Sequence, residues 1–276
     1  MSLIMNLRNE LAKAFTLTEP AQKVAAMKSL WAARPVWRVL SEDCIEPQPM
    51  GRPLRPVLRP PKEVPSRKPS TPEGLAALIH SVCHIEFNAI NLALDAGWRF
   101  ADMPERYYLD WAKVAYEESL HFEMLSTLLL QMGYTYGDFD AHEGLWQMCE
   151  RTQDDLLARM ALVPRTLEAR GLDATPLIQE KLRTLRGPLE DHAKKALDIL
   201  DIILRDEITH VQIGNHWYLW LCARAQLDPQ ACYAELTLKH RAPKIRPPFN
   251  EEARRLAGFN EADLAALNAF GKDLER

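Results

Sequence analysis

No uninterrupted stretch of 18 apolar residues occurs in the 276-residue sequence, so we expect no membrane-spanning helix. Charged residues at Arg8, Glu10 and Lys13 come too early for the apolar core of a secretory signal. The five cysteines form no Cys-x-x-Cys motif and leave an odd one over, which favours reduced thiols over a disulfide framework. They are Cys44, Cys83, Cys149, Cys222 and Cys232. We therefore predict a cytoplasmic protein that does not enter a membrane.

The composition favours a globular protein. Hydrophobic side chains make up 47% of the sequence and the formal net charge is −4, so the chain can bury a full core. We predict a metal-binding helical domain over 71–227. It is preceded by N-terminal helices with a proline-rich basic arm over 1–70, and followed by a C-terminal extension over 228–276 in which we identify no chemistry.

Two short motifs organise the sequence, Glu-x-x-His at Glu118 and His121 and again at Glu207 and His210. Residues three apart on a helix project from one face, so each motif presents a carboxylate beside an imidazole. Such pairs can ligate a metal ion, although a single copy would be a weak signal.

The spacing of two further glutamates adds specificity. Glu86 lies 32 residues before Glu118, and Glu168 lies 39 before Glu207, which suits two half-helices and a turn in each case. A four-helix bundle that holds two metals uses Glu-x-x-His on two helices and one inward glutamate on each of the others. The sequence therefore predicts an all-α fold with six metal ligands, namely Glu86, Glu118, His121, Glu168, Glu207 and His210.

Caps and apolar periodicity give the predicted bundle helices as 71–97, 104–132, one beginning near Thr152, and 189–225. About 19 residues join the second helix to the third, enough for a long crossover that gives both the same direction. Local signals conflict in the third helix, where Pro164 predicts a kink and Gly171 predicts an end soon after Glu168. Substitutes for this ligand are Glu150, Asp154 and Asp155; a short helix over 176–185 would follow.

Residues 3–33 predict one or two further helices, the second capped by Thr18. Ten of the 19 prolines lie between Pro35 and Pro72, so this arm is predicted to be extended, and it is basic from 51 to 70. Its arginines would bind phosphates or RNA in one interpretation and pair with acidic groups of the bundle in the other, which we favour. Gly214 leaves room beside the metals or allows close helix packing.

The residues before the motifs carry a resemblance. Glu117 and Asp206 are placed to accept the second N–H of a metal-bound histidine across the bundle, Glu117 from His210 and Asp206 from His121. With Glu-Glu-x-x-His and Asp-Glu-x-x-His, the sequence resembles the ferritin-like di-iron carboxylate superfamily, and Glu-Ala-Arg at 168–170 is similar to a motif of its tRNA-hydroxylating members. Residues 70–260 also resemble a bacterial ferritin-like family known only as a domain of unknown function. These resemblances imply a ferritin-like four-helix bundle with a metal site.

The ligand set suits two Fe ions, with Mn possible and Zn or Co as substitutes in vitro. The leading hypothesis is an O2-dependent di-iron oxidase or hydroxylase, of monooxygenase type, that acts on a small or appended organic substrate and accepts electrons from a donor protein. A ferroxidase or peroxide scavenger is the second hypothesis, and a non-enzymatic metal-binding bundle is the third. A helix bundle with an accidental ligand pattern would have to bury six polar groups at a cost of several kcal/mol each.

Overall fold

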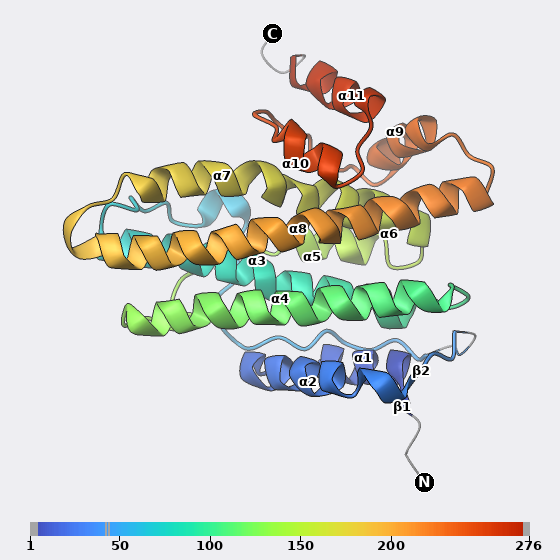
Figure 1. The fold of residues 1–276 in the computed structure, drawn as a ribbon, viewed down its shortest axis with the longest axis horizontal. Coiled ribbons are helices and arrows are strands. Elements are labelled where there is room, and N and C mark those ends of the chain that lie inside the picture. The colour runs from blue at the N-terminus through green and yellow to red at the C-terminus, as the bar shows by residue number, and fades with distance from the viewer. Residues whose placement is uncertain (1–4, 42, 44, 273–276) are drawn as a thin grey trace. The chain divides into compact units, whose positions relative to one another are not determined.

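The fold is all-α, as the sequence predicts. The computed structural model describes residues 5–41, 43 and 45–272, so Cys44 lies outside the described residues. The helices are α1 (Leu7–Thr16), α2 (Pro20–Ala32), α3 (Pro72–Arg99), α4 (Glu105–Gln131), α5 (Gly144–Arg151), α6 (Leu156–Leu162), α7 (Ala169–Arg183), α8 (Glu190–Arg224), α9 (Pro229–Lys239), α10 (Glu251–Leu256) and α11 (Glu261–Lys272). Figure 1 shows their order along the chain.

Shorter elements lie between these helices. Strands β1 (Met5–Asn6) and β2 (Trp37–Arg38) pair in parallel. Three short 3-10 helices are η1 (Arg34–Val36), η2 (Pro61–Glu63) and η4 (Gly187–Leu189), and η3 (Val163–Glu168) is a π-helix. The four described cysteines are free thiols.

The chain divides into two compact units. The first consists of residues up to Gly144 together with Leu185–Ile199, and the second consists of Leu145–Thr184 together with the chain from Leu200 onward. The borders predicted from the sequence at 70/71 and 227/228 stay a prediction.

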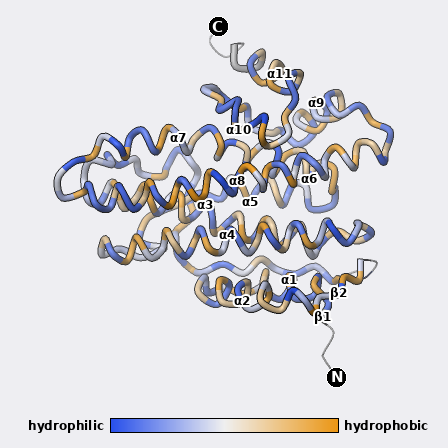
Figure 2. The backbone as a smooth tube through the Cα atoms, in the orientation of Figure 1, coloured by the Kyte–Doolittle hydropathy of each residue, from blue (hydrophilic) through white to orange (hydrophobic). Residues whose placement is uncertain are grey.

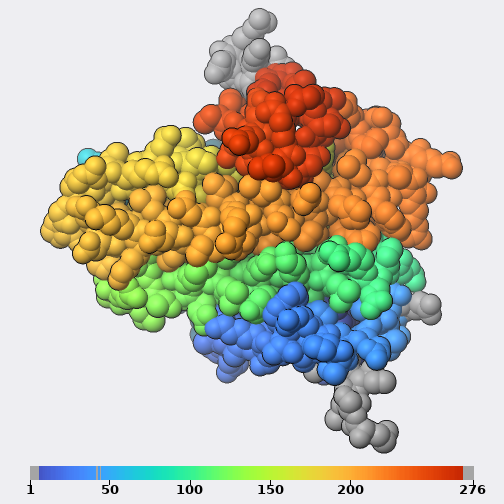
Figure 3. All heavy atoms as spheres, in the orientation of Figure 1, coloured from blue at the N-terminus to red at the C-terminus, as the bar shows by residue number. Residues whose placement is uncertain are grey.

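In the first unit, α3 and α4 form the main helix pair, and α1 and α2 cover it. α1 packs on α3 and α2 packs on α4, and Figure 3 shows the blue atoms of α2 against the green atoms of α4. The Thr71 hydroxyl accepts a hydrogen bond from the Gly74 amide at 3.0 Å and Pro72 occupies the first turn, so α3 begins as the sequence predicts. Gly133, with φ of +81°, ends α4 in the expected position.

α3 passes a length and composition test for a membrane span, as the core helix of a soluble protein also can. Within its most apolar window, 78% is buried in the structure, so this test is weak support for a span. α4 shows polar and apolar residues in alternation along the tube (Figure 2), the pattern of a helix with one buried face.

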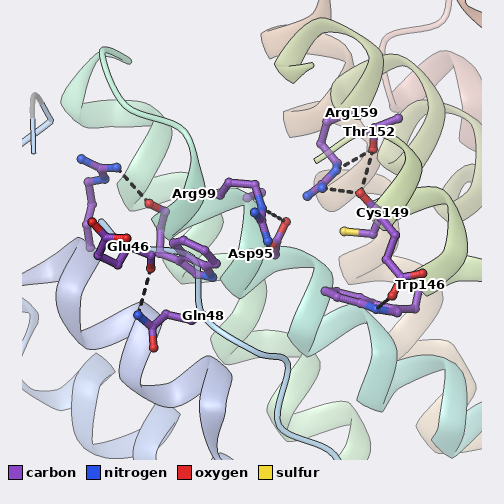
Figure 4. Close-up of polar contacts among 12 residues, drawn as sticks. Glu46, Gln48, Asp95, Arg99, Trp146, Cys149, Thr152 and Arg159 are labelled. Atoms are coloured by element: carbon purple, nitrogen blue, oxygen red, sulfur yellow. Dashed lines mark hydrogen bonds and ion pairs between the residues drawn. The ribbon is translucent and has the colours of Figure 1, made fainter. Parts of the chain in front are cut away.

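The second unit is built around α6, η3 and α7, which follow one another without a break. The helix therefore continues past Gly171, a point that the conflicting local signals left open. The short separate helix over 176–185 is wrong, because α7 continues through Pro176 to Arg183. The third predicted bundle helix also starts later than expected. Asp155, not Thr152, caps α6 by accepting a hydrogen bond from the Ala158 amide at 2.9 Å. The Thr152 hydroxyl instead accepts a bond from buried Arg159 at 2.8 Å (Figure 4).

The C-terminal helices complete the core of the second unit. Ala253, Ala257 and Phe259 cluster with Leu172 of α7 and Val211 of α8.

Near the N-terminal end of the chain, Glu19, not Thr18, precedes the first residue of α2. The cap signal at Thr18 therefore placed the start of α2 one residue too early.

Candidate metal centre

The first unit brings three predicted ligands together. Glu86 lies on α3, and Glu118 and His121 lie on the facing side of α4. His121 Nδ1 is 3.2 Å from Glu86 Oε2 and 3.2 Å from Glu118 Oε2. Each of the three residues offers a ligand atom within 4.8 Å of the others. This buried carboxylate and imidazole cluster could hold a metal ion.

The electrostatics of this cluster favour a cation. Glu86 is 3% exposed and Glu118 and His121 are each 1% exposed. Burial raises the pKa of the Glu86 carboxyl well above its usual range, the Glu118 charge raises it further, and the hydrogen bond from His121 opposes both. A buried carboxylate pair is costly unless protons or a metal ion neutralise it. Carboxylate oxygens and an imidazole nitrogen are donors that suit a divalent ion.

The second unit carries the other motif on α8. His210 is fully buried and Glu207 is 8% exposed, with His210 Nδ1 3.6 Å from Glu207 Oε1. A Cβ added at Gly171 of α7 would lie 4.0 Å from Glu207 Oε2, so the glycine faces this carboxylate. α7, which continues past Gly171, therefore passes beside the motif.

Glu168 is the last residue of the π-helix η3 and directly precedes α7. It stands three residues before Gly171, on the same face of the helix, and it is half-buried. Its backbone is helical, so Glu168 lies within a continuous helix and not at a helix end. π-turns inside α-helices are frequent at functional sites.

Local chemistry explains the π-helix. Pro164 has no amide hydrogen, so the regular hydrogen-bond ladder cannot continue through it. The Thr166 hydroxyl donates to the Ala161 carbonyl at 2.8 Å, five residues earlier, which satisfies a carbonyl that the wider turn leaves over. A Cβ at Gly214 of α8 would lie 2.4 Å from Pro164 Cβ, so Gly214 provides close helix packing. This supports the packing alternative for Gly214.

Side chains that we did not single out from the sequence fix η3. Arg165 is 5% exposed and donates to Asn215 Oδ1 and to Asp263 Oδ1, each at 2.6 Å. Asn215 in turn donates to the Ala257 carbonyl at 2.7 Å. The C-terminal extension, to which we assigned no chemistry, therefore contributes to the position of η3. Asp263 and Arg165 lie 98 residues apart in the sequence, so no local pattern indicated this contact.

The two predicted supporting carboxylates have cationic neighbours on their own helices. Glu117 lies 3.3 Å from Lys113, and Asp206 accepts from Arg205 at 2.9 and 3.1 Å. Their predicted hydrogen bonds to His210 and His121 stay predictions.

Comparison with known proteins identifies relatives but no activity. The family described as "Protein of unknown function (DUF455)" matches residues 16–265. A protein of Haemophilus influenzae, described as an uncharacterized protein, is 50% identical over 219 residues, which cover 77% of this chain and 74% of the relative. No solved structure matches the chain.

Proposed function

This chain belongs to the DUF455 family of proteins of unknown function, and we propose that it is a dinuclear metal protein, with two irons, that uses O2 to oxidise an organic substrate. The observation that carries the proposal is the buried cluster of Glu86, Glu118 and His121. The second Glu-x-x-His motif, buried on α8, supplies a matching set of donors. Each unit thus contributes one glutamate and one Glu-x-x-His pair.

The fold that suits this function is a ferritin-like four-helix bundle. Its helices would be α3, α4, the run from α6 through η3 to α7, and α8. The lengths of these helices and the long connection between α4 and α6 support the assignment. A two-metal site would require both ligand sets, which the metal stoichiometry tests.

Iron in such a site would supply the electrons that activate O2 for attack on a C–H bond. The residues of the chain would do the rest. Glu86 would exchange its proton for the metal charge, because burial and the Glu118 charge disfavour a bare Glu86 carboxylate. His121 and His210 would bind as neutral imidazoles. Mn would be accepted by the same ligands.

The proposal includes an electron-donor protein, which the oxidation requires, and a cytoplasmic location. A ferroxidase or a peroxide scavenger would need neither an organic substrate nor a reductase. A structural metal protein would bind the ion and show no reaction with oxygen. Stoichiometry and oxygen uptake together separate these alternatives.

The test begins with the metal content of the protein purified from its own host, followed by O2 consumption of the chemically reduced form. Two irons per chain and rapid O2 uptake are expected, both lost in Glu118→Ala and His210→Ala. Glu123→Ala is the matched control, because Glu123 lies on α4 but pairs with Lys28 at the surface. A protein with no metal, or with one zinc and no reaction with O2, would contradict the proposal.

A further inference from the structure

A pocket of about 420 Å³ lies wholly within the first unit, between the proline-rich arm, α3 and the segment after α4. Residues 50–58 of the arm form one side, and α3 supplies His84, Phe87 and Asn88. Tyr136 and Glu143 close the other side. The volume is within the range of small-molecule sites in proteins.

This pocket is separate from the metal ligands. His84, Phe87 and Asn88 have the i, i+3, i+4 spacing of one helix face, whereas Glu86 lies about 150° from the centre of that face at 100° per residue. Glu86 points to His121 of α4, as their 3.2 Å contact shows. The body of α3 therefore separates the two sites.

The floor of the pocket is fixed by hydrogen bonds. His84 Nδ1 is 2.8 Å from the Tyr136 hydroxyl, and His84 Nε2 is 3.1 Å from the His142 carbonyl. Asn88 Nδ2 donates to the His84 carbonyl at 2.9 Å. These hydrogen bonds hold the polar groups of the floor in fixed positions.

The arm that forms the wall is also held in place. The Gly51 amide donates to the Phe15 carbonyl at 2.8 Å, and buried Lys23 donates to the Gly51 carbonyl at 3.2 Å. Further along, the Arg59 amide donates to the Ala141 carbonyl at 2.8 Å and the Ala141 amide donates to the Val57 carbonyl at 3.0 Å. Anchors on both sides of residues 52–56 make this a built pocket.

One charge pair lines the pocket. Arg52 Nη1 contacts Glu143 Oε2, and the two side chains are 48% and 30% exposed, so both charges remain accessible. A ligand with a single charge is attracted by one member of the pair and repelled by the other. A ligand with both charges, in the opposite order, is attracted by both.

Apolar groups line the rest of the pocket. Met50, Pro56 and Leu58 of the arm lie across from Phe87 of α3. Such a lining favours an apolar body on the ligand, because burial of apolar surface drives binding. The charge pair and the apolar lining together favour a ligand that carries two opposite charges and one apolar substituent.

We propose that this pocket binds a zwitterionic small molecule of the apolar α-amino-acid class. The ligand carboxylate contacts Arg52, its ammonium group contacts Glu143, and its side chain packs between Met50 and Phe87. This site is independent of the proposed metal function.

Calorimetric titration with three matched compounds tests the charge requirement. L-phenylalanine carries both charges, 3-phenylpropionate lacks the ammonium group and 2-phenylethylamine lacks the carboxylate. Saturable binding of phenylalanine is expected, with each single-charge compound at least about 10-fold weaker. No saturation by phenylalanine or L-leucine below about 1 mM would overturn the proposal, as would equal binding of all three compounds.

Two variants locate the site. Arg52→Met and Glu143→Gln should each weaken phenylalanine binding at least about 10-fold, because each removes one charge contact. Arg59→Met is the matched control. Arg59 lies on the same arm but outside the pocket, where it pairs with Asp140, so this variant should bind phenylalanine as the unaltered protein does. Unchanged affinity in Arg52→Met and Glu143→Gln would overturn the assignment. Metal content measured on the same samples should not change, so the outcome is distinct from that of the metal test.

Discussion

The two units place the same Glu-x-x-His motif in different surroundings. In the first unit, the motif lies on the unbroken helix α4, and His121 is within 3.2 Å of two carboxylates. In the second unit, His210 and Glu207 are 3.6 Å apart and Glu207 faces Gly171, which has no side chain. The motif selects the ligand atoms, but the neighbouring helix decides how much space surrounds them. We infer that the first set is the tighter ligand group and the second the more accessible one.

The units also differ in how their polar groups hold the chain. In the first unit, His80 Nε2 accepts a hydrogen bond from the Gly137 amide at 2.9 Å, and His84 holds Tyr136 and His142. Buried arginines hold the chain in both units, Arg8 in the first and Arg165 and Arg254 in the second. The described contacts of this kind made by imidazoles are those of the first unit. Imidazoles change charge between pH 4 and 7, whereas guanidinium groups do not. The two units should therefore respond differently to acid.

Removal of one histidine from each ligand set should give the largest effect. His121→Ala is expected to weaken metal binding by more than about 100-fold, because it leaves Glu86 and Glu118 buried without their shared imidazole. His210→Ala should also lose its metal on purification, but with a smaller fall in affinity, since its ligand set is less tightly packed. Competition with a chelator measures both. Equal losses would contradict the inferred difference between the sets.

The charged contacts of the second unit are tested by Asp263→Asn. The substitution leaves the Arg165 charge buried without its carboxylate partner, so the free energy of unfolding should fall by about 3–5 kcal/mol. In the first unit, Arg67→Gln breaks an exposed pair with Glu73 and should cost less than about 1 kcal/mol. Denaturant unfolding of both variants measures the difference. A loss below about 1 kcal/mol in Asp263→Asn would show that this clamp does not stabilise the fold.

The neutral histidines of the first unit predict acid sensitivity. Burial lowers the pKa of His80 from 6.5 to about 4, with the Asp138 charge opposing the shift. The unfolded chain therefore binds the proton first as pH falls from 6.5 to 4, and His80 should cost roughly 3 kcal/mol of stability by pH 4. In His80→Gln, the glutamine amide oxygen can still accept the hydrogen bond from Gly137. The free energy of unfolding of this variant should fall less steeply with decreasing pH, because one fewer proton is taken up on unfolding. Denaturant unfolding at several pH values between 4 and 7 measures this slope, and an unchanged slope in His80→Gln would contradict the prediction.

The smallest effect concerns helix packing. Gly214→Ala should lower the free energy of unfolding by about 1–3 kcal/mol, because the new methyl group would meet Pro164 carbons at 2.4 and 2.6 Å. Gly97→Ala in the first unit should cost less, since the nearest atom, at 2.7 Å, is the flexible end of Leu11. Thermal unfolding of the two variants checks the order. A larger loss in Gly97→Ala would reverse it.

Periodicity and caps predicted most of the helical framework. The sequence gives the bounds of α3, α4 and α8 to within two residues, because each carries strong local signals such as Thr71, Pro72 and Gly133. The spacing of Glu86, Glu118 and His121 predicts that they share a site, and in the structure their side chains lie close together. These features depend on one helix or on adjacent helices, where sequence patterns are informative.

Long-range contacts account for the parts that the sequence did not predict. Pro164 locally favours a kink and Gly171 a helix end, but Arg165 is held by Asp263, 98 residues away. Three arginines of the arm, Arg52, Arg59 and Arg67, pair with carboxylates of the first unit, as the packed-arm alternative requires. Nucleic-acid binding by the arm stays untested. Pocket formation by residues 50–58 could not be inferred, since no local pattern indicates where an extended segment packs.

The π-helix also determines which face of α7 lies beside α8. Each residue of an α-helix turns the chain by about 100°, and a π-turn, with its i→i+5 hydrogen bonds, holds about one residue more than an α-turn. If Val163–Glu168 adopted a regular α-helix without losing a residue, α7 would rotate by roughly 100° relative to α6, and Gly171 would turn away from Glu207. Deletion of one residue within this segment would allow a regular helix and keep α7 in its present orientation. The wider turn, rather than any one of its side chains, therefore places Gly171 beside the α8 motif.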